Sequence, residues 1–213
     1  MTQSEGRRAQ LLWPEAGMLP VGAGDLRNAS RLSLTLRAAK LVSPSGELLC
    51  ILRDVSATGI KVRLFHPFPA IEDYALELGN GDQHLLEKVW ERDGHAGFKF
   101  SEGPIDVAEM LDATPRFPRR QIRLRLDLPA RLTFNEAEQP ALIRDISQQG
   151  ALIETSQQMA LGQQLRLEAA GLPARIGKIR WRRKAAHGLV FEQAFKLDEL
   201  ARIVAAIHTP IRR

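Results

Sequence analysis

Apolar and polar residues alternate along several short segments of the chain, which is the pattern of strands that bury one face. The alternating apolar positions are Leu32, Leu34 and Leu36; Ile60, Val62 and Leu64; Leu124, Leu126 and Leu128; and Leu165 and Leu167. Polar turns, among them residues 79–82 and 170–173, separate such segments at intervals of about 8 to 15 residues. This spacing favours antiparallel hairpins over strand–helix–strand units, so we expect an all-β protein whose sheets close into barrels.

The same motifs occur twice along the chain. Arg27 and Arg31 lie 92 residues before Arg119 and Arg123. At an offset of 91, Asp54, Ser56, Gly59, Trp90, Gly97 and Phe100 correspond to Asp145, Ser147, Gly150, Trp181, Gly188 and Phe191. An internal repeat of this kind predicts two similar domains, residues 25–111 and 112–213, after a flexible lead at residues 1–24. The two offsets differ by one residue, so one copy has an extra residue between the arginines and the aspartate. We place this one-residue slip in the first hairpin turn, where loop length varies at little cost.

A short helix is expected after each barrel. The segment 104–111 begins with Pro104, which is tolerated at a helix start, and carries Asp106 and Glu109. The later segment is clearer because its apolar residues share one face and acidic residues occupy its first turn. Its apolar positions are Leu197, Leu200, Ala201, Val204 and Ile207, and Pro210 ends it.

Composition excludes several classes of site. A single cysteine, Cys50, allows no internal disulfide and no cysteine-based zinc site. No apolar run approaches the roughly 20 residues that span a bilayer, and the N-terminus lacks the design of a signal peptide, so we expect a cytoplasmic protein. The first repeat carries more acidic than basic side chains and the second repeat the reverse, although the whole chain has a net charge of +5. The second repeat is therefore the better candidate for binding an anion.

Two motifs of the second repeat suit a guanine nucleotide. Arg119, Arg120 and Arg123 precede a predicted strand, and guanidinium groups fork onto phosphate oxygens or the O6/N7 edge of guanine. About twenty residues later comes Asp-x-Ser-x-x-Gly, formed by Asp145, Ser147 and Gly150. A carboxylate accepts from guanine N–H groups, a serine hydroxyl donates or accepts, and glycine lets the backbone approach a ligand.

This pair of motifs resembles the PilZ family, whose members are small β-barrels that bind cyclic di-GMP. The resemblance extends to Trp181 and to the closing Gly188, Leu189, Val190 and Phe191. It implies two PilZ-like six-stranded antiparallel barrels, each followed by a short C-terminal helix. It also implies a ligand site at Arg119, Arg120, Arg123, Asp145, Ser147 and Gly150, with a possible second site at Arg27, Arg31, Asp54, Ser56 and Gly59.

The functional expectation is a cyclic di-GMP receptor that converts ligand binding into a domain rearrangement or a contact with a protein partner. The alternative is a degenerate adaptor of the same family that binds proteins without nucleotide. We expect Trp90 and Trp181 to pack on the barrels rather than to stack on a ligand. No nucleophile with a base, metal cluster or phosphate loop is recognisable, so we expect neither an enzyme nor a cofactor. Nucleic-acid binding is disfavoured because few aromatics accompany the basic residues of the second repeat.

Overall fold

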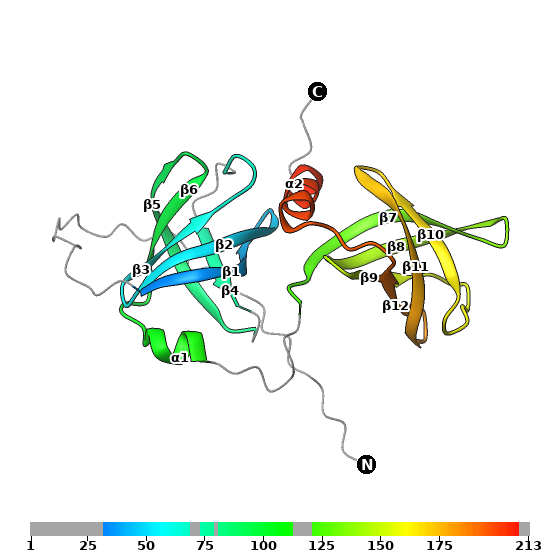
Figure 1. Cartoon of the computed structure of the whole chain (residues 1–213), viewed down its shortest axis with the longest axis horizontal. Coiled ribbons are helices and arrows are strands. Elements are labelled where there is room, and N and C mark those ends of the chain that lie inside the picture. The colour runs from blue at the N-terminus through cyan, green and yellow to red at the C-terminus, as the bar shows by residue number, and fades with distance from the viewer. Residues whose placement is uncertain (1–31, 69–72, 79–80, 113–120, 209–213) are drawn as a thin grey trace, which may run out of the picture.

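The chain folds into two closed barrels of six antiparallel strands each (Figure 1). The computed structural model describes residues 32–68, 73–78, 81–112 and 121–208. The first barrel has the strand order β1-β2-β3-β6-β5-β4 and consists of β1 (Leu32–Ser43), β2 (Gly46–Ser56), β3 (Gly59–Arg63), β4 (Asp73–Glu77), β5 (Gln83–Arg92) and β6 (His95–Phe100). Pairing of β1 with β4 closes it, so no strand is left at an open sheet edge.

The second barrel repeats this topology strand by strand. It consists of β7 (Leu124–Phe134), β8 (Ala137–Ser147), β9 (Gly150–Glu154), β10 (Gln164–Ala169), β11 (Leu172–Arg183) and β12 (Ala186–Phe191). Pairing of β7 with β10 closes it. Alternate residues point inward, so Leu124 and Leu126, or Leu165 and Leu167, lie in the core. The predicted fold of two six-stranded antiparallel barrels is confirmed.

The one-residue slip between the repeats lies in a bulge of the first strand. Residues 34–36 of β1 are unpaired with β2, where only residues 126–127 of β7 are unpaired with β8. Both hairpin turns hold two residues, 44–45 and 135–136. Our expectation that the turn absorbs the slip is therefore wrong. A bulge takes the extra residue more readily because it is already a break in the ladder of hydrogen bonds.

Both predicted helices are present. The first, α1 (Val107–Asp112), begins where the Asp106 carboxylate accepts from the main-chain N–H groups of Ala108 and Glu109, which caps the helix. The second, α2 (Leu197–His208), is amphipathic. Neither helix of the described ranges is long and apolar enough to cross a membrane.

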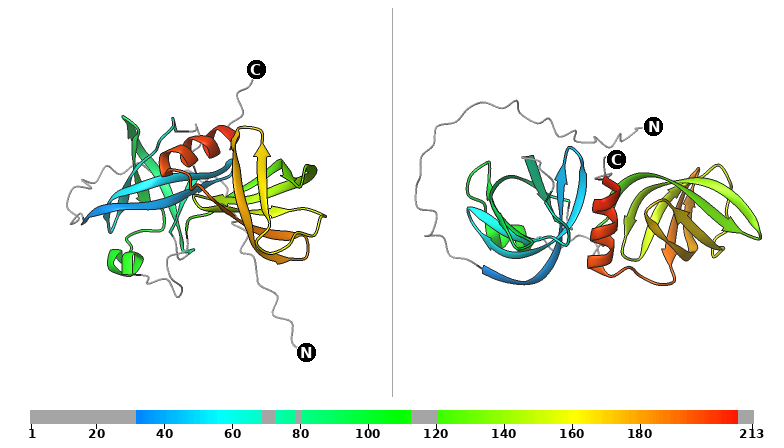
Figure 2. Two further views of the ribbon diagram at one scale, coloured as in Figure 1. Left: turned by 45° about the vertical axis from the view of Figure 1, so that its right-hand side comes forward. Right: turned by 90° about the horizontal axis from the view of Figure 1, so that it is seen from above.

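Helix α2 lies between the two barrels, as Figures 1 and 2 both show. Its buried Leu200, Ala201 and Val204 join the core of the second barrel, whereas Ala205 joins the core of the first. In return, Leu49 of β2 packs into the core of the second barrel. The two barrels thus share one helix and exchange apolar side chains.

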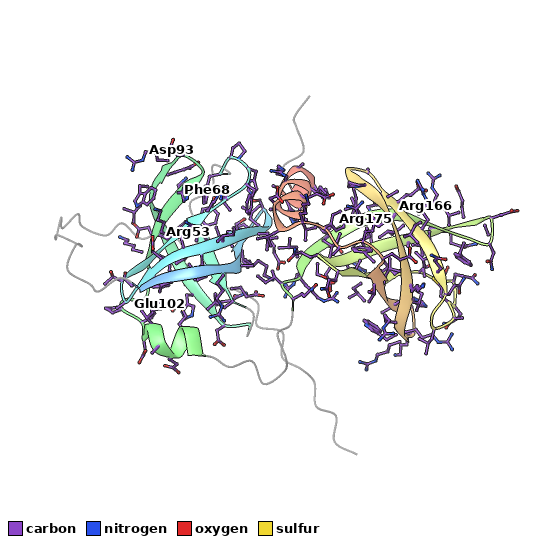
Figure 3. The ribbon with its side chains drawn as sticks, in the orientation of Figure 1. Arg53, Phe68, Asp93, Glu102, Arg166 and Arg175 are labelled. Carbon is purple, nitrogen blue, oxygen red and sulfur yellow. The ribbon has the colours of Figure 1, made fainter. Side chains whose placement is uncertain are left out.

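The start of α2 is fixed to the second barrel by Arg175 of β11, labelled in Figure 3. The Arg175 guanidinium lies 4.0 Å from the centre of the Phe195 ring. It also donates to Glu199 in the first turn of α2 over 2.8 Å. A cation stacked on an aromatic ring and paired with a carboxylate is held in one orientation, which fixes the direction in which α2 leaves the barrel.

Candidate functional site

Arg123 and Asp145 meet on the surface of the second barrel. Leu124, fully buried in the core, fixes the start of β7, and Arg125 pairs with Asp145 across β7 and β8. Arg123 Nη1 then donates to Asp145 Oδ1 at 2.5 Å. The Arg123 side chain is 48% exposed and that of Asp145 is 19% exposed, so the pair stays accessible from solvent. Arg119 and Arg120 lie outside the described residues.

Ser147 and Gly150 serve the strand turn between β8 and β9. The Ser147 hydroxyl donates to the Gly150 carbonyl over 3.2 Å, and Ser147 is only 1% exposed. A Cβ on Gly150 would come within 2.1 Å of the Leu189 carbonyl oxygen of β12. Glycine is therefore required at residue 150 by the close approach of β12, a need that the motif alone did not reveal.

A bulge in β8 immediately precedes Asp145. Arg144 is the extra residue of β8 between the pairs that Ile143 and Asp145 form with β9. Its guanidinium donates to Glu154 over 2.8 Å and to Asp127 over 2.6 Å, and these hydrogen bonds raise the pKa of Arg144 above its usual value. Sequence reasoning missed Arg144. The signal was an arginine before the motif aspartate in both copies, since Arg53, labelled in Figure 3, occupies the equivalent bulge.

Trp181 lies beside the same face of the barrel. It follows a bulge in β11 and pairs with Gly188 of β12, over which its ring is folded. Trp90 and Gly97 form the same arrangement in the first barrel. Trp181 is 45% exposed and Trp90 is 39% exposed. Each indole therefore covers a strand with one face and leaves part of its surface open.

The motif residues of the first barrel line a surface pocket of about 320 Å³. Asp54, Ser56, Gly59 and Trp90 are among its lining residues. The Ser56 hydroxyl donates to the Gly59 carbonyl over 3.2 Å, as its counterpart Ser147 does to Gly150. The equivalence of the two motifs thus extends to individual hydrogen bonds. Arg27 and Arg31 lie outside the described residues.

Cationic side chains surround this pocket. Lys61, Arg92 and Lys99 are among its lining residues, and Lys99 pairs with Glu87 at 2.8 Å. At the offset of 91, Leu152 and Val190 replace the two lysines in the second barrel. Net charge of the whole repeat, on which we ranked the two sites, conceals this local excess of basic side chains.

In the described part of the chain, no group of three or more histidine, cysteine or acidic residues could hold a metal ion.

The second barrel matches a known protein family. Residues 117–207 match the PilZ domain family. A comparison with curated protein sequences gave no match.

Similar solved structures include three proteins of low sequence identity. The PlzA protein of Borreliella burgdorferi, in complex with c-di-GMP, is 14% identical over 86% of this chain and 95% of its own, with a TM-score of 0.34. The inhibitor of motility MotI/DgrA of Bacillus subtilis is 13% identical over 83% and 97%, with a TM-score of 0.35. YcgR of Escherichia coli, in complex with c-di-GMP, is 10% identical over 79% and 81%, with a TM-score of 0.30. Residues 117–207, which include the second barrel and α2, are thus similar to the PilZ domain family.

Proposed function

We propose that the protein is a cyclic di-GMP receptor whose main site lies on the second barrel. The observation that carries this proposal is the exposed contact of Arg123 with Asp145, inside the region that matches the PilZ domain. The two side chains offer complementary chemistry at one place. A guanidinium binds phosphate or the guanine O6/N7 edge, and a carboxylate accepts from the N–H groups of the same base.

Ligand binding exchanges one set of partners for another. Without ligand, Arg123 and Asp145 neutralise each other. An exposed ion pair contributes only about 0–1 kcal/mol, so separating it costs little. With ligand, Arg123 turns to phosphate or guanine while Asp145 holds the base. Arg119 and Arg120, just before Arg123 in the sequence, supply further cations. Ser147 and Gly150 hold the turn that positions Asp145.

A second, weaker binding step is assigned to the first barrel. Its pocket contains Asp54, Ser56 and Gly59 together with Lys61, and Arg27 and Arg31 would complete it. The repeat as a whole is net acidic, which disfavours the long-range approach of a dianion. Lys61, Arg92 and Lys99 favour binding of the anion once it is close to the pocket.

Signalling would follow from a changed contact between the barrels. The segment of residues 112–123 links the barrels and ends at Arg123, so a ligand held by Arg123 would act directly on that link. A protein partner would then read the new arrangement. We assign no catalytic role and no cofactor.

The second candidate function is an adaptor that binds proteins without nucleotide. The Arg123–Asp145 pair favours it to the extent that both charges are already satisfied within the barrel. An adaptor would keep this pair in every state, whereas a receptor must open it.

Calorimetric titration with cyclic di-GMP separates the two candidates. We expect saturable binding by the wild-type protein and loss of the tighter step in Asp145→Ala. Glu138→Ala is the matched control, because it also removes a carboxylate from an arginine pair on β8, that with Arg131, away from the site. Absence of binding by the wild-type protein would leave the adaptor as the conclusion.

A further inference from the structure

A buried polar network of the first barrel reaches the strand that carries Arg123. Lys40 of β1 and Glu47 of β2 are 4% and 5% exposed and form an ion pair at 3.1 Å. Lys40 Nζ lies 2.8 Å from Glu77 and also donates to the main-chain carbonyl of Arg123 over 3.3 Å. An ammonium group has three N–H donors, so these three acceptors match its capacity.

Glu47 holds the same segment two residues further along, at Arg125 of β7. Its Oε2 accepts from the main-chain N–H of Arg125 at 2.7 Å, and its Oε1 lies 3.5 Å from Arg125 Nε. The first barrel therefore binds the main chain on both sides of Leu124. The Leu124 side chain lies in the core of the second barrel, and the Arg123 guanidinium lies on Asp145. Residues 123–125 are held by both barrels at once.

We propose that Lys40 and Glu47 are positioning residues for the ligand site of the second barrel. They fix the backbone from which the Arg123 side chain leaves, so that less conformational entropy is lost when Arg123 binds a ligand. This inference rests on the proposed function, since it names residues outside the PilZ motif that set the affinity of that site. Neither residue touches the ligand.

Because the network is buried, only some of its bonds can be lost. A buried charge that loses its partner is strongly destabilising, so Lys40 and Glu47 stay paired with each other whether or not they hold β7. Their bonds to Arg123 and Arg125 are the ones that can be given up. By linkage, whatever tightens Arg123 on its ligand also tightens the first barrel on β7.

The test compares three changes in one network. Glu47→Ala removes the acceptor of the Arg125 N–H, and Lys40→Met removes the donor to the Arg123 carbonyl. Glu77→Gln is the matched control, because Glu77 contacts Lys40 but not β7. Each variant is made in the full chain, its folding is checked by thermal unfolding, and its affinity for cyclic di-GMP is measured by calorimetry. Hydrogen exchange of residues 123–125 is measured on the same samples.

We expect Glu47→Ala and Lys40→Met to weaken binding about five-fold or more, and Glu77→Gln to leave affinity nearly unchanged. Glu47→Gln should recover part of the loss, because its amide oxygen still accepts from Arg125. Exchange of the Arg125 amide should accelerate in Glu47→Ala without ligand. In an Arg123→Ala background, Glu47→Ala should have no further effect on affinity, whereas general loosening of the fold would weaken binding in both backgrounds.

Two failures are distinguishable. Wild-type protein that does not bind cyclic di-GMP overturns the proposed function, and the positioning role is then judged on the Arg125 amide alone. Wild-type protein that binds, with Glu47→Ala equal to it in affinity and in exchange of that amide, overturns the positioning role and leaves the proposed function intact.

Discussion

The ring of Trp181 lies directly over Gly188, so closely that a Cβ on Gly188 would come within 2.1 Å of the indole nitrogen. Trp90 covers Gly97 in the same way at 2.0 Å. In both copies the tryptophan follows a bulge, which turns its side chain onto the neighbouring strand. Glycine is needed opposite each tryptophan because any side chain there occupies the place of the ring.

Gly188→Ala should therefore displace Trp181 from the barrel surface. We expect a loss of about 1–3 kcal/mol in the free energy of unfolding, the usual cost of overpacking. Indole fluorescence should shift to longer wavelength and become easier to quench with acrylamide. Gly97→Ala is the paired variant, and it should change Trp90 alone. Unaltered quenching in both variants would contradict the placement of the two rings.

Arg123→Ala should weaken cyclic di-GMP binding about 10 to 150-fold, since a hydrogen bond to a charged group contributes about 1.5–3 kcal/mol. The equivalent change in the first repeat, Arg31→Ala, should leave the tighter step nearly unchanged and remove only a weaker one. Titration of both variants checks this ranking of the sites. Loss of the tighter step in Arg31→Ala, with Arg123→Ala unaffected, would move the main site to the pocket beside Lys61 and Lys99.

Stability should fall in mild acid through His208. Its ring packs on Gly46 near Glu47, and burial lowers its pKa below the ordinary 6.5, although the nearby Glu47 acts in the opposite direction. Above pH 6.5 the ring is neutral in both the folded and unfolded states. Below it the unfolded chain takes up the proton first, so stability decreases as pH falls toward the lower folded-state pKa.

Thermal unfolding measured from about pH 7.5 to 5.5 tests the role of His208. His208→Phe should reduce the slope of melting temperature against pH. His66, whose pKa is also lowered by burial, contributes in the same direction and accounts for part of the slope that remains. An identical slope in wild-type protein and His208→Phe would exclude a contribution from the contact between α2 and the first barrel.

Cys50 should react only when the first barrel opens. It is fully buried, its thiol donates to the Ala39 carbonyl, and burial raises its pKa far above the ordinary value, so thiolate is scarce. We expect alkylation at pH 8 to be on the order of a hundredfold slower than in the denatured chain. Because Cys50 is the single cysteine, mass spectrometry of the intact protein reports this opening directly. Rapid labelling under native conditions would contradict a closed first barrel.

The sequence predicted the architecture well because two signals agreed. Alternation placed the strands, and the repeat offset placed equivalent strands in two barrels. The offset did not locate the slip, because a bulge leaves no residue type as its marker: residues 34–36 look like any alternating strand. Helix α2 was predicted from its periodicity, but its position between the barrels was not, since Ala205 gives no sign of a second partner.

The candidate site was predictable only in part. The contact of Arg123 with Asp145 follows from motifs whose spacing brings β7 and β8 together. No sequence motif marks the network of Lys40, Glu47 and Arg125. It forms because the first hairpin contacts the second barrel, and this tertiary contact cannot be read from the sequence. The local cations of the first pocket were hidden for a similar reason, since Lys61 and Lys99 lie on separate strands within a net acidic repeat.

The shared helix also determines when the first barrel can finish folding during synthesis. Ala205 belongs to its core, yet it is translated after every strand of both barrels. A ribosome adds about 5–20 residues each second, so the first barrel waits several seconds with that part of its surface uncovered. During this time the exposed patch is open to chaperones and to neighbouring chains. The first half of the protein is thus completed no earlier than the second half.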